Sequence, residues 1–499
     1  TGPVTENRFP PLQVPEGFRS TLFASDPLME YPSTLARGPR LGTVFVAQDY
    51  LTGLGIEIVK RDEIRFLEDQ DGDGYADRTT CYASEFNSIQ GITYHDGVVY
   101  VVHSPLLTAL RDTNGDGIAD QRQDLLNGLG LAPEQNPPRL HCGNGIVMGH
   151  DNWLYIALGD HGCRVRRPEG DWLILEGGGI LRCRADGRDL HIFSRGLRNI
   201  YDVVLDENIN VFVRDNENDG GDYKIRVYHS IFGSDHGYPY DYLERPEVTM
   251  QPLADLGLGS SAGGTSYLET AFPPDYQGNL FFCEWGRSVV RYPRESKGSG
   301  FQPMQEFEFA VASETDPYGF KPTDIVVDWD GSLLISDWAD GQRPRRGRGR
   351  IYRIFHGDTG STAERTTDSL SSLVSDLNEE SYLKRHHAQT RLQHLGKSIS
   401  TEALWHFMLK EKLERRAKSH VVWLLAERGD PYSANILWEF AEKDQDPSVQ
   451  AQAVRALADW HDPVFVDDRL DSKRCDERIA ERIARIGVGA DAVVILEVV

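Results

Sequence analysis

A repeated strand pattern constrains the fold of this chain more than any other feature. Six segments share a polar turn followed by a run of aromatic and aliphatic residues: PRLGTVFVAQ (39–48), HDGVVYVVH (95–103), HDNWLYIAL (150–158), ENINVFVRD (207–215), YQGNLFFCE (276–284) and WDGSLLISD (329–337). Their apolar anchors, Phe45, Tyr100, Tyr155, Phe212, Phe281 and Leu334, recur at steps of 55, 55, 57, 69 and 53 residues. This spacing is typical of propeller blades with four strands each.

Each repeat is too small to bury its own apolar face, so neighbouring repeats must stack to form a core. The sequence therefore predicts a mainly β fold, a six-bladed β-propeller over residues 12–356. The strand GRIYRIF (349–355) is expected to close the last blade. An irregular β-sandwich is the alternative fold.

A second region follows, because the strand pattern stops after about residue 357. The Ser/Thr-rich segment 357–378 is predicted to be a linker, and residues 379–488 to form a short α-helical, HEAT-like solenoid. The segment DPSVQAQAVRALADW is the clearest helix, with Asp446 as N-cap, Pro447 in the first turn and apolar residues at helical spacing.

Charge and motifs exclude several classes of function. The 499 residues include 53 Lys and Arg against 77 Asp and Glu, a net charge of −24, which disfavours nucleic acid as a partner. No apolar run is long enough for a transmembrane segment. The six cysteines form no C-x-x-C pair, so the chain carries no C-x-x-C-H haem motif. It begins at Thr1 without a signal peptide, which was either removed or never present.

Two acidic loops, EDQDGDGYAD (68–77) and RDTNGDGIAD (111–120), occupy equivalent places in the first two repeats. Alternating oxygen-bearing side chains around a sharp glycine turn suit Ca²⁺. The predicted ligands are the side chains of Asp69, Asp71, Asp73 and Asp77 with the carbonyl of Tyr75, and those of Asp112, Asn114, Asp116 and Asp120 with the carbonyl of Ile118. Neither loop has the final Glu or the flanking helices of an EF-hand, so a structural ion is expected. Acidic, solvated turns are the alternative.

The central repeats carry a family resemblance. The segments RLHCGNGIVMGHDNWLYIALGDHG (139–162), EGGGILRCRADGRDLHIFSRGLRNIYDVVLD (176–206) and VRDNENDGGDY (213–223) resemble the glucose/sorbosone dehydrogenase superfamily, six-bladed quinoproteins that bind pyrroloquinoline quinone and calcium. Together with VPEGFRSTLFASDPL (14–28), residues 12–460 resemble more closely a membrane-bound dehydrogenase family of planctomycete-type bacteria. Its members join this propeller to HEAT repeats and often to a haem domain.

The resemblance implies roles for particular residues. His141 matches the catalytic base, which takes the hydroxyl proton while hydride passes from the sugar carbon to the quinone. Arg198 and Asn199 match residues that contact the cofactor, and Lys321 falls on a cofactor-binding arginine. Asp215 lies in the loop that matches the one near the cofactor calcium.

The same resemblance implies a carbohydrate or alcohol substrate, an electron acceptor or cytochrome as partner, and a periplasmic or exported location. The family's cofactor-binding lysine, however, falls near Gly286 in this sequence.

Other interpretations stay open for these residues. His141 could be a buried histidine that hydrogen-bonds a neighbouring blade, and Arg198 could pair with an acid such as Asp160. A non-catalytic, calcium-stabilised propeller and solenoid that binds glycan or protein is the second hypothesis, and a calcium-dependent polysaccharide lyase a distant third. A pocket that contains His141, Arg198, Asn199 and Lys321 together would favour the enzyme.

Overall fold

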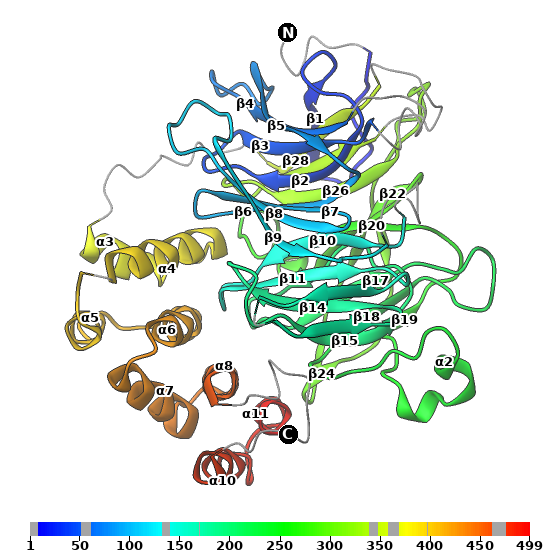
Figure 1. Ribbon diagram of the computed structural model, residues 1–499. Coiled ribbons are helices and arrows are strands. Elements are labelled where there is room, and N and C mark those ends of the chain that lie inside the picture. Colours follow the sequence, from blue (N-terminus) through cyan, green and yellow to red (C-terminus); the bar gives the residue numbers. More distant parts are fainter. Residues whose placement is uncertain are drawn as a thin grey trace.

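Six four-stranded antiparallel sheets surround one axis in the computed structural model, which confirms the six-bladed propeller (Figure 1). The structure describes residues 8–50, 61–131, 140–168, 170–338, 348–357, 369–396, 398–461 and 476–499.

The strands of the first three blades follow one another along the chain. Blade 1 contains β2 (Pro32–Arg37), β3 (Thr43–Gln48), β4 (Asp62–Glu68) and β5 (Arg78–Phe86). Blade 2 contains β6 (Ile89–His95), β7 (Val98–His103), β8 (Leu106–Arg111) and β9 (Gln121–Asn127). Blade 3 contains β10 (Gly143–Met148), β11 (Trp153–Leu158), β14 (Gly178–Arg184) and β15 (His191–Leu197), with the ribbon β12 (Cys163–Arg166) and β13 (Trp172–Leu175) inserted.

The last three blades include longer connections. Blade 4 contains β16 (Val204–Leu205), β17 (Val211–Asp215), β18 (Arg226–Ser230) and β19 (Ala254–Asp255), with α2 (Asp241–Glu244) and a 3-10 turn (Pro246–Val248) before β19. Blade 5 contains β20 (Ser261–Ser266), β21 (Leu280–Glu284), β22 (Ser288–Tyr292) and β25 (Phe307–Val311), with the short pair β23 (Ser296–Lys297) and β24 (Gly300–Phe301) and a 3-10 turn (Pro274–Tyr276). Blade 6 contains β26 (Pro322–Val327), β27 (Leu333–Asp337), β28 (Arg350–His356) and β1 (Phe18–Ser25).

All six apolar anchors of the sequence repeat lie on the second strand of a blade. The prediction for ring closure needs a correction. The strand at 349–355 is the third strand of blade 6, and β1 from the start of the chain supplies the fourth, with Phe18 opposite His356 and Ser25 opposite Arg350. The two ends of the propeller are thus joined within one sheet.

The second region is helical, as predicted. It contains α3 (Leu370–Asp376), α4 (Tyr382–Gly396), α5 (Thr401–Met408), α6 (Arg415–Arg428), α7 (Pro431–Lys443), α8 (Pro447–His461), α10 (Glu477–Ile486) and α11 (Ala492–Val498). Its boundaries are wider than expected, since α3 falls inside the predicted linker 357–378 and α11 lies beyond residue 488. The assignment to HEAT repeats stays a prediction.

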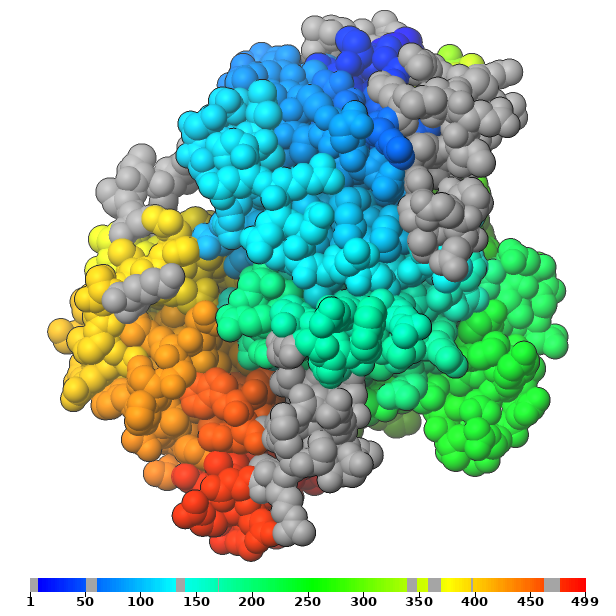
Figure 2. All heavy atoms as spheres, in the orientation of Figure 1, coloured from blue at the N-terminus to red at the C-terminus, as the bar shows by residue number. Residues whose placement is uncertain are grey.

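The helices pack against one side of the propeller (Figures 1 and 2). One hydrophobic core joins Trp153 and Tyr155 of blade 3 and Val213 of blade 4 to Val422 of α6 and Leu457 of α8. Because these side chains are buried together, we expect the two regions to unfold as one cooperative unit. In the part of the chain that the structure describes, no helix is both long and apolar enough to cross a bilayer.

Candidate functional site

The site residues predicted from the sequence lie at one end of the propeller. The inner strands β2, β6, β10, β16, β20 and β26 line an axial cavity, and they all begin at this end, which we call the entry face. His141 precedes β10, Arg198 and Asn199 precede β16, and Lys321 precedes β26. The topology alone therefore places these four residues on the entry face.

His141 and Asp160 form a hydrogen-bonded pair on the entry face. The Nδ1 atom of His141 lies 2.7 Å from Oδ1 of Asp160, and each side chain keeps 24% of its surface exposed. The backbone of His141 has φ of +58°, a left-handed conformation that is uncommon for a residue other than glycine and recurs at functional sites. Gly159 permits this turn, because a Cβ there would lie 2.5 Å from the Cα of His141.

The ionisation of Asp160 depends on its neighbours. Burial alone raises the pKa of Asp160, but the hydrogen bond from His141 and the electrostatic effects of His141 and Arg198 outweigh burial and lower the pKa below its ordinary value. Asp160 therefore stays ionised at neutral pH and holds the imidazole in place.

Asp215 fixes the turn that carries Arg198 and Asn199. Its carboxylate accepts hydrogen bonds from the backbone amides of Arg198 (2.7 Å) and Asn199 (2.8 Å), from the amide of Asn216 (2.8 Å) and from the hydroxyl of Tyr223 (2.6 Å). Burial raises the pKa of Asp215 despite these four bonds, which favour the anion. The structure thus gives Asp215 a positioning role, and its role as a metal ligand stays a prediction.

The same arrangement, an acid that accepts from the amides of a neighbouring turn, recurs in blades 5 and 6 and was not predicted. Glu284 and Asp337 also end the second strand of their blades, and they accept hydrogen bonds from the amides of Ser260 and Lys321 at the corresponding turns. The signal was present, since the repeats of blades 4, 5 and 6 all end in an acid: VRD, FCE and ISD.

Arg198 lies beside the His141–Asp160 pair. Its side chain is almost fully buried, and its Nη2 atom lies 3.0 Å from Oδ2 of Asp219, which is exposed. Its Nε atom is buried without a hydrogen-bond partner among the described residues. Asn199 accepts a hydrogen bond from Asn144 of the neighbouring blade at 2.9 Å. Arg198 therefore forms its ion pair with Asp219. Asp160, the partner considered as an alternative from the sequence, is affected only by the charge of Arg198 at longer range.

Lys321 belongs to a second group on the entry face. Its Nζ atom lies 4.2 Å from the ring centre of Trp285, a distance suited to a cation–π interaction. The ring centre of Trp285 lies 6.4 Å from that of Trp338, and the ring centre of Trp338 lies 6.2 Å from that of Tyr31. The structure thus brings His141, Arg198 and Asn199 together, while Lys321 lies with aromatic side chains of blades 5, 6 and 1.

The two acidic loops join the third and fourth strands of adjacent blades, and their internal hydrogen bonds match. Asp69 accepts from the amides of Gly72 (2.8 Å) and Gly74 (2.9 Å). In the second loop, Asp112 accepts from Gly115 (2.7 Å) and Gly117 (2.8 Å). Carboxylate oxygens of Asp69, Asp71 and Asp77 all lie within 4.8 Å of one another. The donor set of the first loop therefore fits a small oxygen-binding cation.

Each acidic loop also ties its blade to the preceding one. The amide of Ala76 donates to the carbonyl of Phe23 on β1, and the amide of Ala119 donates to the carbonyl of Tyr82 on β5, both at 2.8 Å. The loops differ at the preceding position, because Tyr75 is buried whereas Ile118 is 49% exposed. An ion in either loop would therefore stabilise contacts between blades.

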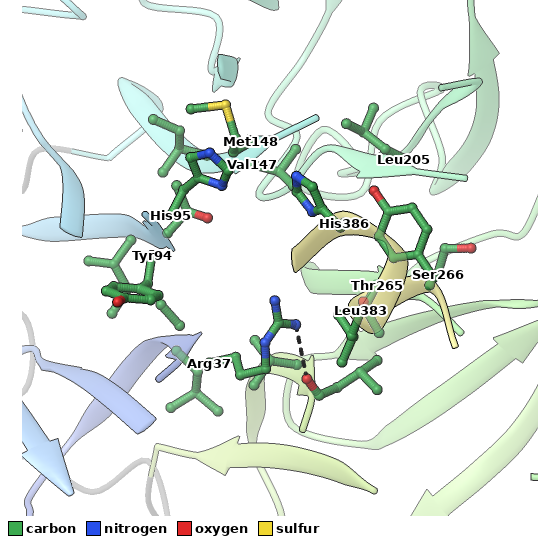
Figure 3. A pocket seen from close by; sticks show the side chains of 18 of the residues that line it. Arg37, Tyr94, His95, Val147, Met148, Leu205, Thr265, Ser266, Leu383 and His386 are labelled. Atoms are coloured by element: carbon green, nitrogen blue, oxygen red, sulfur yellow. Dashed lines mark hydrogen bonds between the residues drawn. The ribbon is translucent and has the colours of Figure 1, made fainter. Parts of the chain in front are cut away.

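The propeller also contains an axial cavity away from the entry face. A cavity of about 550 Å³ runs along the axis from the inner strands to helix α4 (Figure 3). It is lined by residues from all six blades, but His141, Arg198, Asn199 and Lys321 are not among them. No local sequence pattern indicates this cavity, because its floor comes from α4, a helix far away in the chain.

Comparison with known proteins gives a family and a fold. Residues 5–358 match the model of a family described as a domain of unknown function, DUF7133. No curated protein matches the sequence. A Thermus thermophilus structure described as an oxidoreductase (glucose dehydrogenase) has 19% identity and a TM-score of 0.50 over 68% of this chain and 100% of that chain. A Trichoderma reesei structure of carbohydrate-active enzyme family AA12, an iodide form, has 12% identity and a TM-score of 0.52 over 70% and 98%. At such identities these likenesses show the fold alone.

Proposed function

The chain belongs to the DUF7133 family, and from the geometry of its entry face we propose that it is a sugar or alcohol dehydrogenase that works with a quinone cofactor. The His141–Asp160 pair carries this proposal, because a histidine held at 2.7 Å by an ionised carboxylate is the arrangement of a general base. The similarity in fold to a structure described as a glucose dehydrogenase supports the choice of reaction.

His141 is proposed to take the proton from the substrate hydroxyl. With Nδ1 donating to Asp160, Nε2 carries the lone pair that accepts a proton, and the carboxylate stabilises the imidazolium that forms. Arg198 places a positive charge next to this pair, where it can stabilise an oxyanion. Asp215 fixes the turn that carries Arg198 and is therefore a positioning residue.

The entry face offers suitable groups for pyrroloquinoline quinone, an o-quinone with three carboxylates. Arg198 and Asn199 would hold it, and the unpartnered buried Nε of Arg198 is one observation in favour. Lys321, the third expected contact, lies against Trp285 in the second group, so only part of the expected set is gathered at His141. When bound, such a quinone supplies the acceptor for the hydride that leaves the substrate carbon. A calcium ion near the loop 215–222 would have to share Asp215 with its four hydrogen bonds or use other oxygen atoms.

The two acidic loops are proposed to bind structural Ca²⁺. The matching hydrogen-bond pattern and the close carboxylates of the first loop support this assignment. Asp73, Asp77, Asn114 and Asp120 complete the side-chain sets, with the carbonyls of Tyr75 and Ile118. Because the loops lie on the outer part of two blades, these ions would act on stability rather than on the reaction.

The substrate class, the electron acceptor and the exported or periplasmic location belong to the same proposal and follow from the family resemblance of the sequence. The test is to add the quinone and Ca²⁺ to the purified protein, measure uptake by absorption and mass spectrometry, and assay a panel of sugars and alcohols with a dye acceptor. Uptake with oxidation of at least one substrate is expected. If the protein takes up no quinone and oxidises no substrate, the non-catalytic scaffold that binds glycan or protein replaces the dehydrogenase.

A further inference from the structure

The axial cavity is separate from the entry face. Between the two, the inner strands approach so closely that small residues are required: a Cβ on Gly145 would lie 2.1 Å from Oδ1 of Asp202, and one on Gly263 would lie 2.3 Å from Oδ1 of Asp324. Thr34 closes the ring with a hydrogen bond to Asp324 at 2.6 Å. The cavity below this ring is floored by α4 and is therefore a distinct compartment.

Arg37, at the end of β2, projects into this cavity (Figure 3). Its only hydrogen bond is a long one, from Nη1 to the carbonyl of Val327 at 3.3 Å, and its Nε atom is buried without a partner among the described residues. Burial lowers the pKa of Arg37 below its ordinary value. Among the described residues no carboxylate lies within ion-pair distance, and the guanidinium stacks 4.9 Å from the ring centre of Trp329.

Removing a guanidinium from water costs free energy, because only a well-placed anion compensates for its lost hydration. Arginines of the propeller that are fully buried have such anions: Arg182 contacts Asp151 and Asp459, Arg214 contacts Glu284 and Glu306, and Arg350 contacts Asp316 and Asp337. Glu269 also lines the cavity, but it accepts a hydrogen bond from the amide of Leu383 at the start of α4. The negative charges of Asp328 and Glu269 act on Arg37 from a distance, but neither carboxylate forms an ion pair with it, so the guanidinium faces the cavity without a direct anionic partner among the described residues.

Two further polar groups on the cavity wall lack partners among the described residues. They are Nε2 of His386, on α4, and Oγ of Ser266, on β20. Burial holds the pKa of His386 well below its ordinary value, so its ring is neutral and offers one donor and one acceptor. Three unsatisfied groups from three elements therefore line one cavity, and Arg37 and His386 face each other across it (Figure 3).

We propose that the axial cavity is a binding site for a small hydroxylated organic anion, whose carboxylate or phosphate pairs with Arg37 and whose hydroxyls reach His386 and Ser266. The volume of about 550 Å³ is sufficient for a molecule of sugar-acid size. Entry is from the side, because the lining residues Pro39, Asp96, Gly97 and His387 are exposed to solvent. The site is independent of the proposed dehydrogenase reaction.

The test is calorimetric titration and thermal shift of the full-length protein with gluconate, with glucose 6-phosphate and with the neutral control sorbitol. We expect saturable binding of at least one anion and none of sorbitol. Arg37→Gln should weaken binding at least about 10-fold, as for a lost charge-assisted hydrogen bond. The matched control Arg188→Gln removes an arginine that is exposed on the surface and should bind like wild type.

Two other variants keep the test decisive. Thr265→Leu fills space in the cavity while leaving Arg37 intact, so it should also weaken binding of the anion. This variant keeps the proposal testable if Arg37→Gln fails to fold. His141→Ala, on the entry face, should leave anion binding unchanged. The proposal is wrong if neither anion binds, if Arg37→Gln and Thr265→Leu both bind like wild type, or if His141→Ala abolishes binding.

Discussion

Trp153 of blade 3 donates a hydrogen bond from its indole nitrogen to Oδ2 of Asp459 in α8, at 2.8 Å. The same carboxylate lies 2.9 Å from Arg182, which stacks against the Trp153 ring and also contacts Asp151. This buried network connects the propeller to the helices at a point where all four side chains are nearly inaccessible. The two regions are therefore expected to unfold together.

Removal of Asp459 tests this connection. Asp459→Ala leaves Arg182 with one buried partner instead of two and Trp153 without its acceptor, so we expect a loss of about 3–5 kcal/mol in the free energy of unfolding. Urea denaturation followed by fluorescence measures it. Asp186→Ala, which breaks an exposed pair with Arg188, is the control and should change stability by less than about 1 kcal/mol. Equal, small effects of the two variants would contradict the account.

Calcium removal tests the acidic loops. Since an ion that binds only the folded state stabilises it, EDTA should lower the Tm and added Ca²⁺ should restore it. The double variant Asp71→Ala, Asp116→Ala should no longer respond, whereas Glu314→Ala, an exposed acid outside the loops, should respond like wild type. A melting curve of the wild type that is indifferent to EDTA would show that the loops are acidic turns only.

Buried histidines should make the fold sensitive to acid. Burial lowers the pKa of His150 and His236 to about 3 and that of His95 and His229 to about 4. Between these values and about 6.5, the unfolded chain binds protons that the native state excludes, so these groups reduce stability as the pH falls through that window.

A single substitution isolates this effect. His236→Gln removes one such group, so the variant should lose less stability than wild type between pH 7 and pH 4.5, by up to about 1.4 kcal/mol per pH unit. The measurement is urea unfolding at a series of pH values. Burial raises the pKa of Asp324 and Asp328 to about 6, so these acids add stability as the pH falls. They are present in both wild type and variant, so the difference between the two proteins reports His236 alone. Parallel pH profiles of wild type and variant would contradict the assignment.

Arg198 offers a test of charge geometry. Its planar guanidinium donates to Asp219 and lies near Asp160, so Arg198→Ala should lower turnover and weaken the quinone. Arg198→Lys should restore only part of both, because a point charge replaces a fork of donors. Kinetics with a dye acceptor and titration of the quinone report the two effects separately. Full activity of Arg198→Ala would remove this residue from the site.

The propeller could be predicted from local sequence because each repeat carries its own strand anchor and turn. The role of β1 could not, since Phe18 pairs with His356 at the other end of the propeller and nothing local marks that partner. His141, Arg198 and Asn199 lie on one face because each precedes an inner strand of its blade. The pairing of Asp160 with His141 could not be predicted, because their hydrogen bond is formed across a turn in which His141 has a left-handed backbone.

The axial cavity lay beyond sequence analysis for a similar reason. Arg37 reads as an ordinary strand-end arginine, and His386 as one of two adjacent histidines on a helix. Only the docking of α4 over the inner strands makes them face each other across an unfilled space (Figure 3). Docking of this kind depends on the shared core between distant segments, which no local pattern encodes.

The most direct test of the account is the rate of substrate oxidation by His141→Ala, measured with quinone, Ca²⁺ and a dye acceptor on protein whose folding is checked by its Tm. Loss of the general base predicts a fall of ~10²-fold or more, with Asp160→Asn also slowed and the exposed control His406→Ala unchanged. A His141→Ala protein that oxidises the substrate as fast as wild type would contradict the proposed mechanism.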